Sequence, residues 1–506
     1  MSHVSFSFLA QPLRSGKRLL FAGVLALALP ACTTLNPATG KSEFTPFMSP
    51  AQEKKIGAEN HPAVLAEHGG VYDDPELGGY VASVGGRLVA ASEMPDEPFT
   101  FTVLNSPLVN AFALPGGYIY VTRGILALFN DEAEMASVLG HEIGHVTARH
   151  TAKRYNQQMF AGLLGAGIGI FAKNEQVGQL FNYGSQLYLL SYSRDQEYQS
   201  DELGVRYTSR AGMNPYGAPD MLRALQAETE LQDLISNRTG ESRPPEFFST
   251  HPNTQERAQR ARAAARATGL APQSRPRHRD RYLAAIDGMI YGDDPKQGLI
   301  RGRTFWHGEL RFTFEAPEHY RLINSSEAVL IQGTGPAQGS VALFAGGPLK
   351  NRSLSSYLAA LWKDLGADQP LQGLQETRVG GMPALTGWAR GSMQNTPVIV
   401  RLMAIRYSTE QAYHFLMIIP ENLYEAQEQG LRRMTYSFRK LSATEAGKYK
   451  PRRIKIVTVQ QGDTAHSLSR RMAFEDYRLE RFLVLNGLDR TTKLRAGQKV
   501  KLIVEE

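Results

Sequence analysis

Cysteine is almost absent from this sequence, with one residue, Cys32, among 506. A single cysteine excludes a framework of disulfide bonds and any metal site built from several thiolates. Long apolar runs are also missing, because no stretch reaches the roughly 18 residues that mark a membrane-spanning helix. The sequence therefore excludes a disulfide-rich scaffold and a polytopic membrane protein.

Strong charge asymmetry and internal repeats are absent as well. The formal net charge is +7, and no basic stripe with interleaved aromatic residues appears, so we expect no nucleic-acid partner. No repeat with a period of about 34 residues, as in helical repeat arrays, is visible. Hydrophobic residues make up 42% and charged residues 21% of the chain. This is an ordinary globular composition, and the length allows roughly two to four domains.

The N-terminal residues show the pattern of a secretory signal. Three basic residues, at positions 14, 17 and 18, precede a short apolar run, Leu19–Leu29, and small residues then lead to Cys32. This order of basic, apolar and small residues is typical of a cleaved signal peptide. We expect a signal peptide over residues 1–31, whose removal lowers the net charge from +7 to +4.

The tetrapeptide Leu29-Pro30-Ala31-Cys32 resembles a bacterial lipobox. The resemblance implies that Cys32 is acylated and anchors the protein to a membrane. Thr33, in place of Asp, resembles the residue that follows the cysteine in lipoproteins sent to the outer membrane. The alternative is a plain signal with an unmodified, buried Cys32. We expect an outer-membrane lipoprotein on the periplasmic side of a bacterial cell envelope.

Changes in composition divide the rest of the chain. Residues 32–50 are rich in Thr, Asn, Pro, Gly and Ser and are expected to form a tether. Residues 51–275 alternate helical and strand-like runs and are expected to form one domain. Residues 282–440 change to short β-rich runs with two amphipathic helices, which predicts an α+β domain of unknown role. A charged linker, 441–453, follows it.

The last segment, 454–506, has the predicted order strand, helix, helix, strand. Three stretches resemble, in order, the landmarks of a LysM module: Val457–Thr464, Leu483–Leu488 and Leu494–Lys499. The resemblance implies a βααβ fold that binds N-acetylglucosamine polymers such as peptidoglycan. Ala465 and His466 stand where such modules often carry an apolar–aromatic pair. A docking module that has lost its sugar binding therefore stays open as an alternative.

The most specific sequence motif is His141-Glu142-Ile143-Gly144-His145. Histidines four residues apart lie on one face of a helix, so both imidazoles can reach one Zn²⁺. Glu142 lies about 100° round the helix, where it can take a proton from metal-bound water without binding the ion. Asp131–Glu134 predicts the start of this helix as a capping box. The alternative is a surface helix with two unrelated histidines, and a third ligand decides, because catalytic zinc takes three.

Two glycines, Gly140 and Gly144, stand within this predicted helix. Each costs about 1 kcal/mol in a helix interior. Their presence indicates that backbone or substrate approaches the helix closely there.

A candidate for the third ligand follows in a second predicted helix. Ser193 and Gln196 form a capping box, which places Glu197 in the first turn, with Asp201 four residues later on the same face. Glu197 can bind zinc while Asp201 hydrogen-bonds a ligand histidine and orients it. The other interpretation is a solvated acidic helix face.

Together these motifs resemble the gluzincin metallopeptidases of the BepA, LoiP and HtpX type. Two further segments, Asn110–Gly124 and Thr250-His251-Pro252 with Arg257, match other motifs of that family, so the resemblance covers residues 45–275. It implies one Zn²⁺ per chain, with a ligand set, a general base and a supporting carboxylate. The ligands are His141, His145 and Glu197, the base is Glu142 and the supporting residue is Asp201. The BepA branch carries helical repeats after the peptidase, whereas this chain does not.

Three features near this site each have more than one possible role. Strand-like halves around Pro115–Gly117 predict a hairpin, whose edge strand can bind an extended substrate through Asn110, Ala111 and Phe112. An ordinary core hairpin is the alternative. His251 can stabilise an oxyanion, occupy the fourth zinc position, or be a plain turn residue before proline. The Gly-rich segment Phe160–Phe171 is expected to be a mobile loop, a packed turn or a lid.

The predicted fold class is a multidomain α+β protein. A mainly helical zincin-type domain with a small edge-strand sheet precedes an α+β domain and the βααβ module. The expected function is a zinc metalloendopeptidase that cleaves misfolded or unassembled envelope proteins, docked on peptidoglycan and anchored by lipid. The family resemblance alone supplies that substrate class. A peptidoglycan endopeptidase and a scaffold or chaperone with a latent zinc site are the alternatives.

Overall fold

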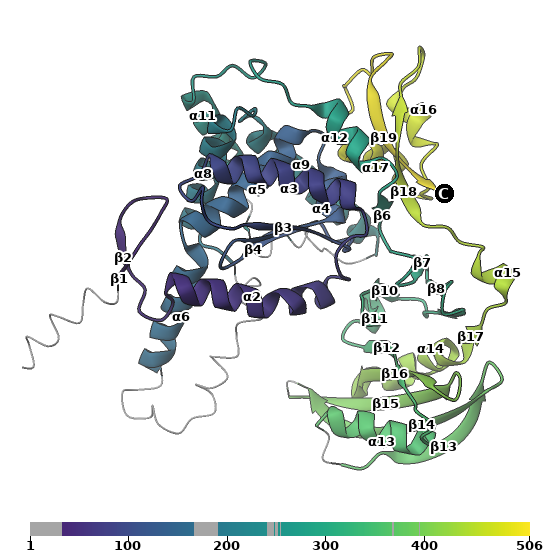
Figure 1. Cartoon of the computed structure of the whole chain (residues 1–506). Helices are drawn as coiled ribbons and strands as arrows, with labels where there is room; N and C mark the ends of the chain where they lie inside the picture. Colours follow the sequence, from purple (N-terminus) through teal and green to yellow (C-terminus); the bar gives the residue numbers. More distant parts are fainter. Residues whose placement is uncertain are drawn as a thin grey trace, which may run out of the picture.

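The computed structural model describes residues 33–165, 191–239, 247, 251–252, 255–366, 369–393 and 395–506. A helical part, a β-rich middle part and a small C-terminal module lie in three different regions of Figure 1. Cys32, the predicted signal peptide and residues 166–171 of the Gly-rich segment lie outside the described residues. Residues 160–165 of that segment are the end of a helix, α6 (His150–Gly165), and not a loop or turn. Within the described ranges, no helix has the length and apolar composition needed to cross a membrane.

The first part is mainly helical. Its helices are α2 (Pro50–Glu67), α3 (Pro75–Ala90), α4 (Arg123–Leu128), α5 (Glu132–Thr147), α6 (His150–Gly165), α8 (Arg194–Arg210), α9 (Gly217–Thr239), α11 (Gln255–Ala267) and α12 (Arg279–Ile286). The predicted start of α5 is confirmed, since Asp131 Oδ1 accepts the N–H of Glu134 at 3.0 Å. The Glu134 carboxylate accepts the N–H of Asn130 and not that of Asp131, so only half of the capping box forms. The box of Ser193 and Gln196 at the start of α8 is complete.

A three-stranded sheet lies beside α5, in the order β3 (Thr100–Leu104), β5 (Tyr118–Thr122), β4 (Ala111–Leu114). The predicted hairpin is confirmed, because β4 and β5 are antiparallel and the turn uses Gly116 and Gly117 at φ of 82° and 89°. Only glycine adopts this backbone conformation without strain. Among the described strands, β4 pairs with β5 alone, so it is an edge strand.

The two helices that carry the motifs cross closely. A Cβ atom on Gly140 would lie 3.2 Å from Cα of Gly204, and one on Gly144 would lie 3.2 Å from Cα of Ser200. A Cβ atom on Gly204 would meet the backbone nitrogen of His141 at 2.9 Å. The predicted close approach to α5 is thus confirmed, and the neighbour is the backbone of α8.

Residues 33–49, suggested by composition as part of a tether, fold against the helical part. They form a hairpin of β1 (Thr33–Leu35) and β2 (Ser42–Phe44). Asn36 donates its side-chain amide to the carbonyl of Ala148, just past the end of α5, at 3.0 Å. Composition could not show this docking, because it depends on contacts with residues more than 100 positions away.

The middle part is built on antiparallel sheets. Its strands are β7 (Leu299–Arg301), β8 (Thr304–His307), β9 (Phe312–Glu315), β10 (Tyr320–Asn324), β11 (Ala328–Gly333), β12 (Val341–Pro348), β13 (Gln372–Val379), β14 (Met382–Met393), β15 (Thr396–Arg406), β16 (Gln411–Pro420) and β17 (Arg439–Lys440). Seven of them form one sheet in the order β10-β11-β12-β16-β15-β14-β13, and β17-β9-β8-β7 form another. The two predicted amphipathic helices are confirmed as α13 (Leu354–Asp364) and α14 (Tyr424–Ser437). A short helix, α15 (Ala443–Ala446), leads out of this part.

The C-terminal module has the predicted order strand, helix, helix, strand. Its elements are β18 (Arg452–Thr458), α16 (Ala465–Ser469), α17 (Arg478–Leu485) and β19 (Lys499–Glu505). A third strand, β6 (Ile290–Tyr291), comes from the segment after α12 and pairs with β18. The module is therefore joined to the helical part through its sheet.

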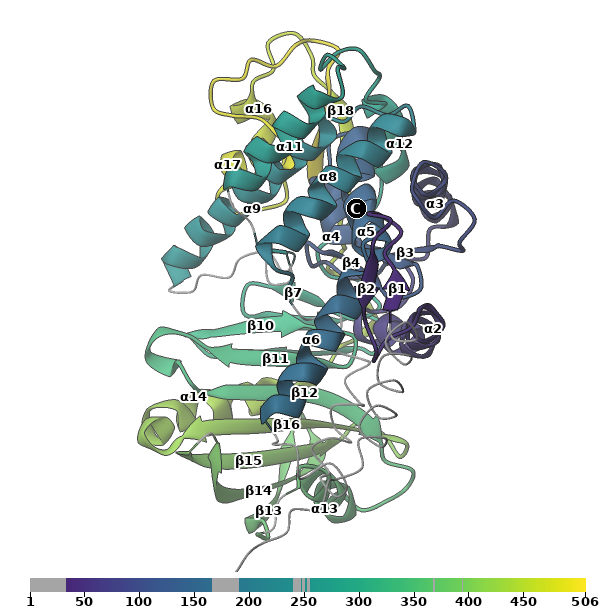
Figure 2. The ribbon, with the colours of Figure 1, turned by 90° about the vertical axis from the view of Figure 1, so that its left-hand side faces the viewer.

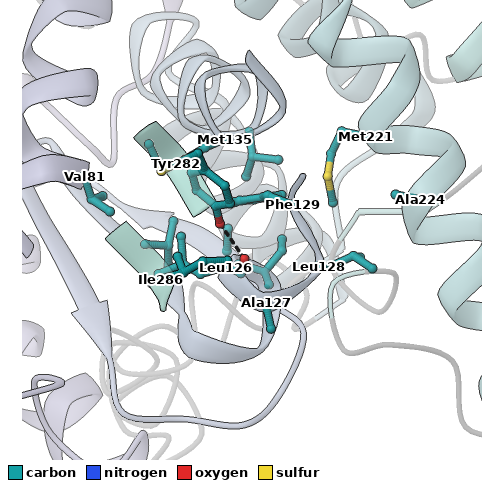
Figure 3. Packing of buried hydrophobic residues seen from close by; sticks show 14 of the residues in the cluster. Val81, Leu126, Ala127, Leu128, Phe129, Met135, Met221, Ala224, Tyr282 and Ile286 are labelled. Atoms are coloured by element: carbon teal, nitrogen blue, oxygen red, sulfur yellow. Dashed lines mark hydrogen bonds between the residues drawn. The ribbon is translucent and has the colours of Figure 1, made fainter. Parts of the chain in front are cut away.

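The module and the helical part also share one hydrophobic core. Phe482, Leu502 and Ile503 of the module belong to the same buried cluster as residues of α3, α5 and α12. Figure 3 shows part of this core, where Tyr282 lies beside Phe129 and Met135 and donates its hydroxyl to the carbonyl of Leu126. The middle part packs around a separate cluster.

Candidate metal centre

Four buried side chains converge at one point. His141 and His145 come from α5, Glu197 from α8 and His251 from the segment before α11, and their ligand atoms all lie within 4.8 Å of one another. Nε2 of His141 is 3.0 Å from Nε2 of His145, and each lies 3.5 Å from a carboxylate oxygen of Glu197. Ligands held tetrahedrally at about 2.0–2.1 Å from a zinc ion are about 3.3 Å apart. The spacing of this donor set fits one zinc ion.

A carboxylate contacts His141 on the side of its ring that faces away from the other donor atoms. Asp201 Oδ1 lies 2.9 Å from Nδ1 of His141, the nitrogen on the far side from the metal-facing Nε2. Arg257 holds Asp201 with two bonds of 2.8 Å and reaches Glu197 Oε2 at 2.7 Å. One guanidinium thus positions both a ligand and the carboxylate that orients another ligand. Such outer contacts fix the tautomer and angle of metal-binding histidines.

The other ligand histidine has partners that sequence reasoning missed. Nδ1 of His145 lies 2.9 Å from Nδ1 of His150, whose Nε2 lies 2.9 Å from Gln199 Oε1. The ring of Tyr192 stacks on that of His145 with 3.7 Å between centroids. His150 stands five residues after His145, a spacing off the ligand face of α5. It reaches the site because the chain turns at Arg149 before α6 begins, a feature without a signal in the spacing of histidines.

Glu142 gives the clearest sign of chemistry at this point. Its side chain is fully buried, and neither carboxylate oxygen accepts a hydrogen bond from any described residue. His251 Nε2 lies 3.6 Å from Oε1. Burying a carboxylate without a donor is unfavourable by several kcal/mol, so Glu142 in this position does not stabilise the fold. A structural zinc site needs no such acid.

The pKa values of the three acids in the cluster are shifted in different directions. Burial raises the pKa of Glu142, and the electrostatic influence of the nearby His251 and His141 only partly opposes this shift. Burial acts on Glu197 in the same direction, yet His251 and Arg257 hold its pKa below the ordinary value. Arg257 likewise outweighs burial at Asp201 and lowers the pKa of that carboxyl. The ligand and the orienting acid are therefore carboxylates, while Glu142 binds a proton more readily.

Burial also keeps His145 in its metal-binding form. It lowers the pKa of His145 well below the ordinary value, and the nearby His141 and His150 lower it further. Metal binding requires the neutral imidazole, so this environment favours a ligand. Burial lowers the pKa of His141, but the hydrogen bond to Asp201 and the negative charges of Glu197 and Asp201 together outweigh burial and raise it.

The site residues predicted from the sequence lie in one region. His141, Glu142, His145, Glu197, Asp201 and His251 meet at the cluster, and β4, with Ala111 and Phe112, packs against α5. Asn110 precedes β4, and its buried Oδ1 accepts no hydrogen bond from any part of the chain that is described. Cys32 lies outside the described residues.

Comparison with known families assigns two segments of the chain. Residues 75–265 match the model of peptidase family M48, and residues 457–502 match the LysM domain. The "Beta-barrel assembly-enhancing protease" of Yersinia pestis is 32% identical over 234 residues, which is 44% of this chain and 45% of that protein. The "Mitochondrial metalloendopeptidase OMA1" of Arabidopsis thaliana is 32% identical over 170 residues, 33% of this chain and 32% of that one.

The similarity covers only part of each protein. The chain spans 45% of the Yersinia pestis protein and 32% of the Arabidopsis thaliana protein. Among solved structures, that of LpqN, involved in cell envelope biogenesis of Mycobacterium tuberculosis, matches 26% of this chain and 83% of that one. Its TM-score is 0.21 and its sequence identity is 13%, values too low to indicate a shared fold or function. The zinc-binding donor set lies within the first matched segment, residues 75–265. The chain thus contains a zinc-dependent metallopeptidase domain of family M48 and, at its C-terminal end, a LysM domain.

Proposed function

We propose that the protein is a zinc metalloendopeptidase in which Glu142 is the general base. The observation that carries this proposal is the buried Glu142 carboxylate, which accepts no hydrogen bond from the described residues, beside three residues spaced to hold zinc. Zinc bound by His141, His145 and Glu197 supplies a Lewis acid that acidifies water and polarises a carbonyl group. The remaining steps belong to the residues of the chain.

Glu142 accepts the proton of the attacking water and then delivers it to the leaving amine of the cleaved peptide bond. The raised pKa of Glu142, which burial causes, brings its proton affinity closer to that needed for both transfers. Asp201 and Arg257 do not touch the substrate in this scheme. They keep His141 and Glu197 in position.

The edge strand β4 is the proposed binding site of the substrate. An extended polypeptide added to this edge gains backbone hydrogen bonds, with little dependence on its side chains. At the far end of β4, Leu114, Pro115 and His145 line a cavity of about 200 Å³. Phe99 and Met94 supply apolar lining there, so the pocket suits an apolar side chain of the bound polypeptide.

His251 is proposed to hold the fourth position in a resting state. Its Nδ1 lies 3.3 Å from Nε2 of His141 and 3.0 Å from Oε1 of Glu197, which places it inside the donor set. A catalytic zinc site needs that position open. His251 therefore has to leave before a substrate carbonyl binds, and in the open state it can face the oxyanion.

The proposed setting is the bacterial cell envelope. One relative is named for enhancing β-barrel assembly, and the LysM domain is of a kind that binds peptidoglycan. We propose that the substrates are misfolded or unassembled envelope polypeptides. A lipid on Cys32 would anchor the protein to the outer membrane, and residues 1–31 would be the signal peptide. The loops of the LysM domain at Gln460–Gly462 and Asp489–Lys493 are exposed, which leaves them accessible to glycan.

The test compares zinc content and casein cleavage for the wild type, Glu142→Gln and His251→Ala. We expect zinc in all three proteins and loss of cleavage in Glu142→Gln alone, by about a thousandfold or more. A gain of cleavage in His251→Ala supports the resting-state role of that histidine. Glu202→Gln, an exposed neighbour of the site, is the matched control.

Two results would contradict the proposal. Absence of zinc from the wild type would remove the metal centre. Cleavage retained in Glu142→Gln would remove the general base. If the wild type binds zinc and digests purified peptidoglycan but not casein, the protein is a peptidoglycan endopeptidase.

A further inference from the structure

The β1–β2 hairpin carries two exposed apolar side chains on its outer face. Thr34 and Glu43 are paired across the hairpin and face the body of the protein, where they are half-buried. Leu35 and Phe44 occupy the opposite face and are 61% and 50% exposed. Their cross-strand partners on that face, Ser42 and Thr33, are also exposed. A two-stranded ribbon packed on a protein in water usually places its large apolar side chains on the inner face, so the exposure of Leu35 and Phe44 is unusual.

A third exposed apolar residue extends this face. Phe160, on α6, is 36% exposed and stacks on Phe44 with 6.0 Å between ring centroids. Figures 1 and 2, two views at right angles, both place the hairpin beside α6. Leu35 and Phe44 are diagonal neighbours on the outer face, so the three side chains form one apolar surface. We call Leu35, Phe44 and Phe160 the apolar face.

The hairpin is held rigidly at the end of the metal-binding helix. The amide of Ala38 donates to the carbonyl of Thr147 at 3.1 Å, and Lys153 pairs with Glu43 at 2.8 Å. Arg149 donates to Thr34, to the carbonyl of Met48 at 2.9 Å and to Glu53 at 3.1 Å.

Arg149 makes these contacts from a left-handed backbone conformation, with φ of 53°. This conformation costs a residue other than glycine about 1 kcal/mol, so the contacts of its side chain offset a strained position. The apolar face is thus fixed relative to His145, two residues before Thr147.

Two residues of the apolar face, Leu35 and Phe44, follow the predicted lipid attachment closely in the sequence. This closeness indicates what covers the face. β1 begins at Thr33, directly after Cys32 and four residues after the apolar run Leu19–Leu29. One residue of extended chain spans at most about 3.5 Å. If Cys32 is acylated, as proposed above, the membrane attachment lies directly before the hairpin. The exposed Lys41, at the hairpin turn, suits the phosphate groups of phospholipids.

We propose that the apolar face is a membrane-contacting surface that inserts into the headgroup region of the bilayer beside the lipid attachment. It fixes the metal centre close to the membrane, so the enzyme acts on polypeptides at the membrane surface and not at the end of a flexible tether. The inference rests on the proposed membrane attachment for its location. It is independent of whether the metal centre is catalytic.

The test uses the full chain reconstituted in phosphatidylethanolamine–phosphatidylglycerol vesicles with brominated acyl chains, which quench tryptophan only on contact. Phe44→Trp and, separately, Leu35→Trp report on the face. Leu365→Trp, at a residue 50% exposed in the middle part, is the matched control. The native tryptophans, Trp306, Trp362 and Trp388, all lie in the middle part and give the background in the wild type.

We expect bromine to lower the added emission of Trp at 44 and 35 about twofold, with no change in the wild type or in Leu365→Trp. Emission from the vesicle-bound protein that is quenched no more at 44 and 35 than at 365 would overturn the proposal. Shielding at 44 from aqueous acrylamide without bromine quenching would overturn it in favour of a protein partner, a second copy or another segment of this chain.

The outcomes are kept separate from those of the proposed function. The intact mass of the vesicle-bound protein shows whether Cys32 carries lipid. Casein cleavage is measured on the same preparations. Unquenched but active protein contradicts the membrane surface alone, whereas quenched but inactive protein contradicts the peptidase alone.

Discussion

The carboxylate of Asp201 lies 2.9 Å from Nδ1 of His141, on the side of the ring opposite the nitrogen that faces the other ligands. Its two oxygens also accept two hydrogen bonds of 2.8 Å from Arg257. Asp201 is thus placed to hold the angle of His141, a proposed metal ligand, from outside the donor set. The same guanidinium contacts Glu197, so α8, α5 and α11 are joined at this point.

The first prediction concerns this orienting carboxylate. Asp201→Asn keeps the shape of the side chain but removes the charge that Arg257 and His141 face, so zinc affinity should fall by about 10- to 100-fold. Competition with a chromogenic chelator measures the dissociation constant. Glu202→Gln, on the exposed side of the same helix, should bind zinc like the wild type. Equal affinity in both variants would show that Asp201 does not position His141.

The second prediction concerns the crossing of α5 and α8. In Gly204→Ala the new methyl group would meet the backbone nitrogen of His141 at 2.9 Å, so the helices must separate. We expect a loss of about 1–3 kcal/mol in the free energy of unfolding, with weaker zinc binding. Chemical denaturation and the chelator assay measure the two effects.

The control for this variant is Gly86→Ala on α3, where a Cβ atom has open space around it. It should be neutral or more stable by up to about 1 kcal/mol, because alanine favours helix more than glycine. A Gly204→Ala protein as stable as Gly86→Ala would contradict the close crossing.

The third prediction concerns the contact between the LysM domain and the peptidase domain. Nζ of Lys501 is buried and donates to the carbonyls of Ala127 and Phe129 at 2.8 and 2.6 Å, at the end of α4. Lys501→Met leaves these carbonyls without a donor, which should destabilise the protein by about 1–3 kcal/mol. Lys499→Met, on the same strand with a half-exposed side chain, should change little.

The measurement is limited proteolysis together with thermal unfolding. We expect one cooperative transition for the peptidase and LysM domains, since they share a buried core. A LysM domain that unfolds separately, in the wild type as in Lys501→Met, would show that the shared core does not couple them.

The fourth prediction concerns the pH dependence of stability. Burial raises the pKa of Glu53 from 4.5 to about 7, although Arg149 opposes the shift. The folded state then holds the proton more tightly than the unfolded state, so this contribution is present below pH 4.5 and is lost as pH rises through 7. Its size is on the order of 1–3 kcal/mol.

Denaturation at several pH values between 4.5 and 8 tests this, with Glu53→Gln compared with the wild type. The variant should lose the part of the pH dependence in which stability falls toward neutral pH. Glu59→Gln, on the same helix with its side chain 61% exposed, should keep it. Parallel pH curves for all three proteins would contradict the raised pKa.

Much of the candidate site follows from local spacing. His141 and His145 share a helix face because they are four residues apart, and Glu197 falls in the first turn of α8 because a capping box precedes it. These arrangements depend only on helix geometry, which neighbouring residues determine. The family resemblance added His251, whose distance from the other ligands no local pattern contains. The order of elements in the LysM domain could be predicted for the same local reason.

Contacts that depend on how the chain turns and packs could not be predicted from the sequence. His150 meets His145 only because the chain reverses at Arg149, and β6 joins the LysM sheet across more than 150 residues. The docking of the β1–β2 hairpin at the end of α5 joins residues 112 positions apart, and composition alone suggested a tether there.

The sequence by itself determined the ligand types, the helix that holds two of them and the chain order of the domains. Tertiary structure alone decided which backbone α5 packs against, which residues surround each ligand and which side of the peptidase domain carries the exposed apolar face. Helix formation and capping are governed by residues within a few positions of one another, whereas these contacts depend on the packing of segments far apart in the chain.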